Sequence, residues 1–159
     1  MKLLYLDFDG VLHDDAVYWH PKHGIYLATP NCTLFEWMYI LEALLEPHPD
    51  IFIILSTSWV RVKSFEFAKK KLSPNLQSRV VGATFHNREM QKADFDFLSR
   101  GYQILADVKR RQPSSWFAID NDDEGWPIQY RENLVLTTDR LGINEETVQN
   151  SIREMLLRM

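Results

Sequence analysis

The chain has 159 residues, of which 45% are hydrophobic and 25% are charged, and its formal net charge is −4 at pH 7. This size and composition are typical of one globular domain that can bury a proper core, so we expect a single domain over residues 1–159. The negative charge argues against general nucleic-acid binding, because no basic excess is available to neutralise phosphates. A local basic patch is still compatible with this balance.

Cys32 is the single cysteine, which excludes an internal disulfide and fits a reducing compartment. No apolar run approaches the roughly 20 residues of a membrane span. Asp7 and Asp9 interrupt the N-terminal apolar run too early for a secretory signal. The sequence therefore predicts a cytoplasmic protein that does not enter a membrane.

Short apolar runs alternate with helix-like stretches along the whole chain. The predicted strands are, in order, 3–8, 51–55, 79–84, 116–119 and 133–138. The predicted helices are 31–45 (with Asn31 or Thr33 as N-cap), 59–72, 101–111 and 144–159. The run IFIIL at 51–55 is continuously apolar and β-branched, as in a strand buried on both faces. This regular alternation predicts a three-layer α/β fold with a central five-stranded parallel sheet and no large cap domain.

Polar clusters follow three of these predicted strands. The first strand ends in DFDG, the second in STS and the fourth in DNDDEG. Parallel sheets of this kind bind ligands outside the carboxyl ends of their strands, at the point where the strand order reverses. We therefore expect these three clusters to meet at one edge of the sheet and to form a site.

Other polar and aromatic groups have simpler interpretations. His20 and His23 are expected in a polar turn between aromatic strands, because no carboxylate or cysteine accompanies them. Trp37, Trp59 and Trp116 are expected in the core. The three lysines at 69–71 are expected on a solvated helix end, near the negative pole of its dipole.

The motifs DFDGVL, LSTSW and WFAIDNDD, in this order, resemble those of the haloacid dehalogenase (HAD) superfamily of phosphatases and phosphotransferases. DFDGVLH, STSW, RGYQI and FAIDND are similar to small capless members, including HAD domains associated with RNA-repair proteins. This resemblance implies a Mg²⁺-dependent phosphatase in which Asp7 is the nucleophile that forms an aspartyl-phosphate. Asp9 would protonate the leaving oxygen and then deprotonate the attacking water.

The resemblance also implies the ligands of the metal and of the phosphate. Asp7 and Asp120 would supply side-chain oxygens to Mg²⁺, and Asp9 its backbone carbonyl. Ser56 would hold a phosphate oxygen together with the backbone that follows it. Thr57 and Ser58 are alternatives for this role, and Ser56 is favoured because the apolar run stops there. Side chains at positions i and i+2 of an extended strand lie on the same face, so Asp7 and Asp9 can both contact one phosphate.

Gly10 would let the chain turn away close to the ligand. The resemblance also implies a basic residue, usually Lys and less often Arg, that neutralises the phosphate and the nucleophile. Lys109 is close to Asp120 in sequence, but the helix 101–111 must run antiparallel to the following strand. Its C-terminal end then lies about 15 Å from the active edge, at a rise of about 1.5 Å per residue. Arg100, at the start of this helix, lies on the correct side and is the predicted phosphate-binding cation.

The second acidic partner of Asp120 is left open among Asn121, Asp122 and Asp123. Only a short segment, about 13–28, follows the first motif, which is enough for a flap but not for a cap domain. Trp19 and its neighbours in this flap are expected to pack rather than to bind substrate. The resulting open site suits a large phosphorylated substrate, such as a nucleic-acid end or a phosphoprotein, or closure by another subunit.

Two other functions fit parts of the pattern. A phospho-accepting receiver module shares this architecture, but it carries its phosphorylated aspartate on the third strand, and RVVGAT has none. A catalytically silent HAD scaffold that binds a partner is the second alternative. The sequence favours the phosphatase, and it does not identify the substrate.

Overall fold

A computed structural model describes residues 1–88 and 90–159. The described residues form a five-stranded sheet in the order β5-β4-β1-β6-β7, and all its neighbouring strands are parallel. The strands are β1 (Lys2–Leu6), β4 (Ile51–Leu55), β5 (Val80–Ala83), β6 (Ser115–Asp120) and β7 (Leu134–Leu136). The predicted parallel sheet is therefore confirmed. β1 lies in the centre of the sheet. β4 and β5 lie on one side of it, and β6 and β7, which come later in the sequence, lie on the other.

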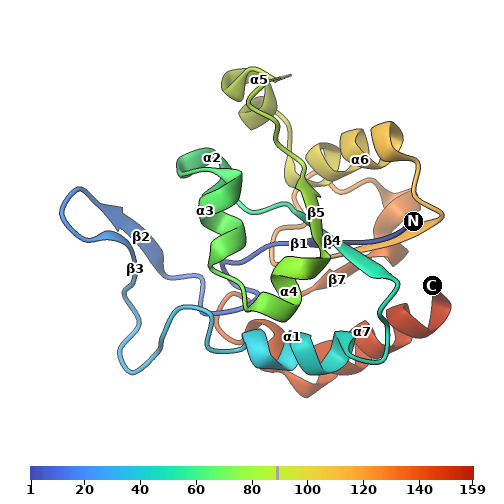
Figure 1. The fold of residues 1–159 in the computed structure, drawn as a ribbon, viewed down its shortest axis with the longest axis horizontal. Helices are drawn as coiled ribbons and strands as arrows, with labels where there is room; N and C mark the ends of the chain where they lie inside the picture. The colour runs from blue at the N-terminus through green and yellow to red at the C-terminus, as the bar shows by residue number, and fades with distance from the viewer. Residues whose placement is uncertain (89) are drawn as a thin grey trace.

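Helices cover both faces of the sheet (Figure 1). One face packs against α1 (Met38–Leu45), α3 (Phe65–Lys70), α4 (Pro74–Arg79) and α7 (Glu146–Arg158). The other face packs against α6 (Arg100–Arg111). The shorter elements are α2 (Trp59–Val62), α5 (Lys92–Phe97) and the 3₁₀ turns η1 (Ile128–Asn133) and η2 (Gly142–Asn144). No helix of the described residues is long and apolar enough to cross a bilayer.

Alternate residues of β1 supply the two cores. Leu4 and Leu6 point into the larger core, which α1 and α7 complete. Leu3 and Tyr5 point into the smaller core beneath α6. The Tyr5 hydroxyl donates a hydrogen bond of 2.9 Å to the buried carboxylate of Asp107 on α6. Lys2 is half-buried and the other four residues of β1 are buried. Because the strand is packed on both faces, it fixes the position of the residues that follow it.

The predicted helix 31–45 starts later than expected. Residues 31–37 form turns, and α1 begins only at Met38, with Trp37 rather than Asn31 or Thr33 at its N-cap position. Asn31 and Phe35 have φ values of 61° and 60°, in the left-handed region that a right-handed helix cannot contain. The first half of this stretch is therefore a loop of mostly exposed or partly buried residues, despite the helical spacing of its apolar positions.

The predicted helix 59–72 is two helices. α2 ends at Val62, and Ser64 then caps α3 by accepting a hydrogen bond from the Phe67 N–H. Val62, the last residue of α2, is 52% exposed. The periodicity of the sequence did not predict α4 or α5. β7 is also shorter than the predicted strand 133–138.

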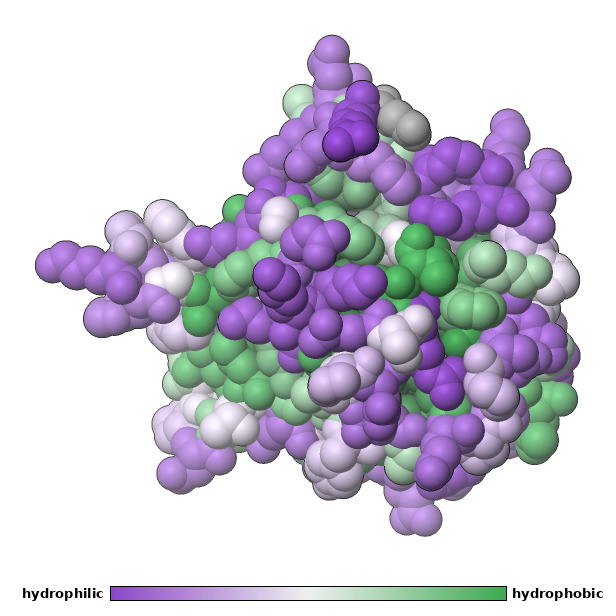
Figure 2. Space-filling model, in the orientation of Figure 1, coloured by the Kyte–Doolittle hydropathy of each residue, from purple (hydrophilic) through white to green (hydrophobic). Residues whose placement is uncertain are grey.

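The expected flap segment contains an antiparallel hairpin of β2 (Val17–His20) and β3 (Gly24–Leu27). It extends away from the sheet in Figure 1. Apolar side chains gather where it joins the rest of the molecule (Figure 2). His20 and His23 stack on each other near its turn, at a centroid distance of 4.7 Å. Of the predicted core tryptophans, Trp37 and Trp59 are buried, and Trp116 is half-buried against the smaller core.

Candidate active site

Two carboxylates and one guanidinium meet at the carboxyl ends of β1 and β6. Asp7 follows β1, Asp120 is the last residue of β6, and Arg100 is the first residue of α6. Arg100 Nη1 lies 3.8 Å from Asp7 Oδ1, and Arg100 Nε lies 3.5 Å from Asp120 Oδ2. The structure thus places Arg100 on the side of the sheet that the antiparallel course of α6 predicts. Lys109, near the other end of α6, lines a different surface depression.

Burial makes this charge cluster unusual. The side chains of Asp7, Asp120 and Arg100 are 5%, 0% and 12% exposed. Burial and the neighbouring Asp120 raise the pKa of Asp7 well above its usual range, although Arg100 opposes the shift. Burial likewise raises the pKa of Asp120 to about 6. Burial disfavours the charge on Arg100 too, but the two carboxylates outweigh it and raise the Arg100 pKa. The cluster therefore holds more negative charge than one guanidinium can balance.

Asp9 lies at the rim of this cluster and is fixed by two neighbours. Its Oδ1 is 2.8 Å from His13 Nε2 and accepts a hydrogen bond of 2.8 Å from the indole Nε1–H of Trp59. The Asp9 side chain is 21% exposed, whereas His13 is fully buried. The sequence pattern placed Trp59 only in the core and gave no role to His13. The available signal was His13, which lies four positions after Asp9, whereas Trp59 lies 50 positions from Asp9 in sequence.

The three hydroxyl residues after β4 have different surroundings. Ser56 is buried, its N–H donates to the Leu6 carbonyl, and its Oγ has no hydrogen-bond partner among the described residues. Thr57 is buried as well, and its Oγ1 accepts a hydrogen bond of 3.3 Å from the Trp59 N–H. Ser58, which the sequence analysis ranked below Ser56, lines the cavity above Asp7. The phosphate-binding hydroxyl stays a prediction: Ser58 lines the cavity, whereas Ser56 and Thr57 are buried.

Gly10 is required by its backbone and by its neighbour. Its φ is +72°, and a Cβ at this position would lie 2.4 Å from Asn121 Nδ2. Its carbonyl accepts a hydrogen bond of 2.6 Å from the Thr137 hydroxyl. Gly10 therefore allows the loops that follow β1, β6 and β7 to close around the site.

An open cavity lies over the cluster and is predominantly acidic. It is lined by Asp7, Asp9, Asp15, Ser58, Arg100, Asn121, Asp122 and Asp139. Asp15 and Asp139 were not predicted as site residues. Asp139 follows the last strand, so the rule that ligands bind at the carboxyl ends of strands could have indicated it.

The structure also distinguishes the three residues after Asp120. The Asp122 N–H donates to Asp120 Oδ1 at 3.0 Å, and Asp122 lines the cavity. Asn121 donates to Asp139 Oδ1 at 2.9 Å. Asp123 points elsewhere and pairs with Arg131. Asp122 is thus the acidic neighbour of Asp120 at the cavity.

A family model matches this chain over residues 3–148, and it describes the HAD domain in Swiss Army Knife RNA repair proteins. The chain belongs to this family. No curated protein and no solved structure gives a significant match to it. The HAD superfamily comprises phosphatase-type hydrolases and generally uses Mg²⁺. The five-stranded parallel sheet without a cap domain is consistent with that fold.

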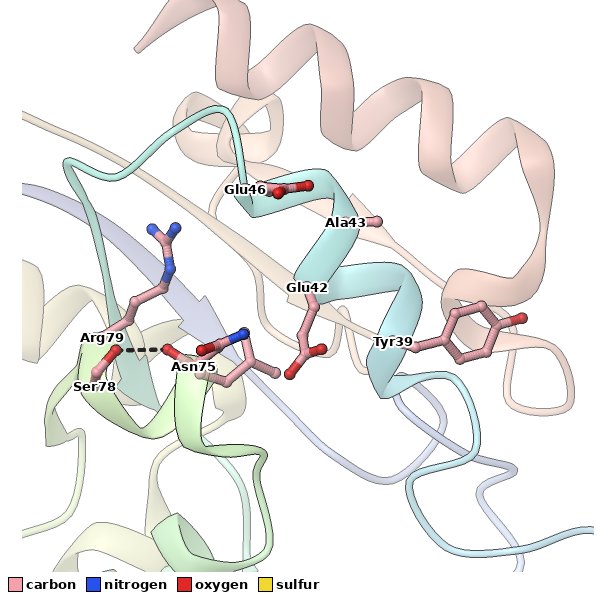
Figure 3. A pocket seen from close by; sticks show the side chains of 8 residues that line it. Tyr39, Glu42, Ala43, Glu46, Asn75, Ser78 and Arg79 are labelled. Carbon is pink, nitrogen blue, oxygen red and sulfur yellow. Dashed lines mark hydrogen bonds between the residues drawn. The ribbon is translucent and has the colours of Figure 1, made fainter.

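A separate groove between α1 and α4 does not belong to the HAD site (Figure 3). Its basic side chain is Arg79, which is already engaged by backbone carbonyls. The guanidinium donates to those of Leu45, His48 and Ile51. Glu42 on the facing helix accepts a hydrogen bond from the Ser73 hydroxyl. The polar side chains of this groove therefore hold α1 and α4 together, and they supply no charge to the cluster around Asp7.

Proposed function

We propose that this HAD protein is a Mg²⁺-dependent phosphatase that acts through an aspartyl-phosphate on Asp7. The main support is the buried pair Asp7 and Asp120, which shares one guanidinium at the base of an open cavity. A strand end carrying only structural aspartates would expose them to water, because burying a carboxylate is costly. Their burial beside a fixed arginine is suited to binding a phosphate together with a cation.

The residues present fit a magnesium ion. Asp120 Oδ2 and Arg100 Nη1 are buried without a hydrogen-bond partner among the described residues. No group of three or more histidine, cysteine or acidic side chains among those residues forms a complete metal cage. Magnesium does not need one, since it commonly takes one or two carboxylates and completes its octahedron with water and substrate oxygens. Asp7 and Asp120 would supply carboxylate oxygens, and Asp9 its backbone carbonyl.

Two phosphoryl transfers complete the proposed reaction. An oxygen of Asp7 attacks phosphorus, the bond from phosphorus to the leaving oxygen breaks, and Asp9 gives its proton to that oxygen. Asp9 then removes a proton from water, whose oxygen attacks the phosphorus of the acyl phosphate. This second step releases inorganic phosphate and restores the Asp7 carboxylate. When bound, Mg²⁺ would favour the ionised carboxylates and withdraw charge from the phosphate oxygens.

Arg100 has a defined part in this scheme. Its guanidinium is permanently charged, and its planar fork can bind two phosphate oxygens. It would orient the phosphate toward Asp7 and balance the charge that develops during transfer. The hydroxyl of Ser56 or Ser58 would bind another phosphate oxygen.

We further propose that the substrate is the phosphorylated end of an RNA. The description of the family supports this class of substrate. An open cavity can admit a chain end, and the hairpin carries the exposed aromatic residues Tyr18, Trp19 and Tyr26, on which bases can stack. Lys63 Nζ lies 5.9 Å from the centre of the Trp19 ring and would add positive charge there. The lining of the cavity is predominantly acidic, so RNA is compared directly with other substrates.

The phosphatase itself is tested by turnover of p-nitrophenyl phosphate with Mg²⁺. We expect activity that EDTA removes and that Asp7→Asn abolishes, with Asp123→Asn as the matched control on the surface. Absence of turnover in the folded wild-type protein would contradict the proposal. A long-lived beryllofluoride adduct on Asp7 would then indicate a phospho-accepting module, and absence of both adduct and metal binding would indicate a silent scaffold.

The substrate class is tested by a panel. Oligoribonucleotides with a 5′- or 3′-phosphate are compared with mononucleotides, sugar phosphates and a phosphopeptide. We expect the highest kcat/KM for a phosphorylated oligoribonucleotide. Preference for another member of the panel would overturn the RNA assignment and leave the phosphatase assignment intact.

A further inference from the structure

The two hydrogen bonds at Asp9 converge on one of its oxygens. His13 Nε2 and Trp59 Nε1 both lie 2.8 Å from Oδ1. These are the hydrogen bonds that described side chains make to this carboxylate, and neither involves Oδ2. A carboxylate held only for stability could receive one donor on each oxygen. This asymmetric arrangement leaves the second oxygen available for other chemistry.

The tautomer of His13 follows from the hydrogen bond at its other ring nitrogen, Nδ1. The backbone N–H of Phe35 donates a hydrogen bond of 3.0 Å to His13 Nδ1. A backbone N–H can only donate, so Nδ1 carries a lone pair and the proton of the neutral ring is on Nε2. His13 is therefore a donor to Asp9. Trp59 is also a donor, because an indole N–H cannot accept.

The fold fixes the Phe35 backbone, and with it the hydrogen bond to His13 Nδ1. Phe35 has a φ of 60°, a conformation that is uncommon for a bulky residue. The Phe35 ring packs edge-on against His13, at a centroid distance of 4.8 Å, and against Trp59, at 5.3 Å. The His13 ring is fully buried and the Trp59 residue is 2% exposed. This dry aromatic setting strengthens both hydrogen bonds to Asp9 and restricts the rotation of all three side chains.

We propose that His13 and Trp59 are positioning residues that assign the transferred proton of Asp9 to Oδ2. This inference rests on the proposed phosphatase function. Because Oδ1 accepts two hydrogen bonds from obligate donors, a proton on Oδ1 would displace one of them. The proton that Asp9 gives to the leaving oxygen, and later takes from water, is thus carried by Oδ2. His13 and Trp59 touch neither phosphate nor water in this step and act through Asp9.

Trp59 also connects two motifs. It follows the serine and threonine residues after β4 and begins α2, whereas Asp9 and His13 follow β1. The indole hydrogen bond therefore links the loop that would hold phosphate to the acid that would protonate the leaving group. A shift of either loop would misplace the proton relative to the scissile bond. General acid–base catalysis depends on such placement and contributes about 10²–10⁴-fold.

The inference is tested with Trp59→Phe on two substrates of similar shape. p-Nitrophenyl phosphate has a leaving group that departs without a proton, whereas benzyl phosphate has a leaving group that needs one. The measured quantity is kcat/KM, which covers the departure of the leaving group. We expect a loss of about tenfold or more for benzyl phosphate and of less than about threefold for p-nitrophenyl phosphate.

Trp126→Phe is the matched control. Trp126 is buried to a similar extent, and its indole N–H also makes a hydrogen bond of 2.8 Å, but to the backbone carbonyl of Tyr130. We expect it to leave the ratio between the two substrates unchanged. Equal losses on both substrates in Trp59→Phe, or the same ratio as in Trp126→Phe, would overturn the assignment.

His13 is tested by a pair of variants. His13→Gln keeps a donor for Asp9 and an acceptor for the Phe35 N–H, so we expect it to retain most of the benzyl phosphate activity. His13→Leu keeps neither and should show the selective loss. If His13→Leu does not fold, Trp59→Phe still decides the proposal. Equal activities of folded His13→Gln and His13→Leu on benzyl phosphate would contradict it.

A measurement without turnover separates this inference from the proposed function. Long-range ¹H–¹⁵N spectra of the wild-type protein report the tautomer of each histidine, and His13 is assigned by its loss in His13→Gln. We expect a neutral ring protonated at Nε2, and an upfield shift of the Trp59 indole proton in Asp9→Ala. A proton on Nδ1 would overturn the positioning role even in an active enzyme. The expected spectra in an inactive protein would refute only the phosphatase.

Discussion

Replacing Asp120 by asparagine should stabilise the metal-free protein while abolishing its proposed activity. Burial raises the pKa of Asp120 from 3.8 to about 6. A shift of about 2 pKa units corresponds to about 3 kcal/mol by which the fold disfavours the ionised form at neutral pH. Asparagine removes this cost and can still accept the hydrogen bond from the Asp122 N–H. This cost is already net of the attraction to Arg100, which lowers the pKa of Asp120, so we expect a gain of about 1–3 kcal/mol in the free energy of unfolding.

The size of this stabilisation depends on pH. Asp120 binds its proton more tightly in the folded protein than in the unfolded one, so folding takes up protons between about pH 4 and pH 6. The stability of the wild-type protein without metal should therefore fall as the pH rises through this window. The advantage of Asp120→Asn should be fully present at pH 7.5 and largely lost near pH 3.5, where Asp120 is mostly protonated in both states.

Chemical denaturation in EDTA at a series of pH values measures this difference. At pH 7.5 the gain corresponds to roughly 2–4 °C in Tm per kcal/mol for a chain of this size. Asp123→Asn, an exposed change in the same loop, should alter the free energy of unfolding by less than about 1 kcal/mol. Mg²⁺ should raise the Tm of the wild-type protein but not that of Asp120→Asn. A variant less stable than wild type at pH 7.5, or a gain independent of pH, would refute the reasoning.

Three further substitutions address the site and its support. Gly10→Ala should lower the free energy of unfolding by about 2 kcal/mol or more, measured by denaturation, because it combines a positive φ with a clash against Asn121; an unchanged Tm would contradict this. Tyr5→Phe should cost about 1–2 kcal/mol through the lost hydrogen bond to buried Asp107 and should leave kcat unchanged, since this contact lies beneath α6; a lower kcat would show that the contact affects the site. Arg100→Lys should reduce kcat/KM by about 10-fold and Arg100→Met by about 10³-fold, because lysine keeps the charge without the planar fork; equal activities would refute a role in phosphate binding.

Much of the fold was predictable because buried parallel strands have a strong local pattern. Runs such as IFIIL are apolar and β-branched whatever surrounds them, and the polar clusters that follow them had to lie at one edge of the sheet. Helix limits were harder to predict. The stretch 31–37 has helical spacing, yet the left-handed Phe35 is fixed by a contact with His13, which is 22 positions away in sequence.

The same distinction applies to the candidate site. Asp7, Asp120 and Arg100 follow from the motif order and from the direction of α6, and the structure brings them together. The contacts of Asp9 could not be read in this way, because a tryptophan in an apolar setting is usually a core residue. Its indole N–H acquires a role only when the neighbouring loop presents a carboxylate. Contacts between loops depend on tertiary packing, which periodicity does not encode.

The central position of β1 has a consequence for how the site is assembled. β1 pairs with β4, where Lys2 faces Ile51, and with β6, where Lys2 faces Ser115. β1 thus has one neighbour that lies about 50 residues later in the sequence and another that lies more than 100 residues later. Such distant pairings are slow, because the loop-closure entropy is lost before the contacts form. We expect Asp7 and Asp120 to meet only when β6 docks, so a partly made chain would be without a formed site.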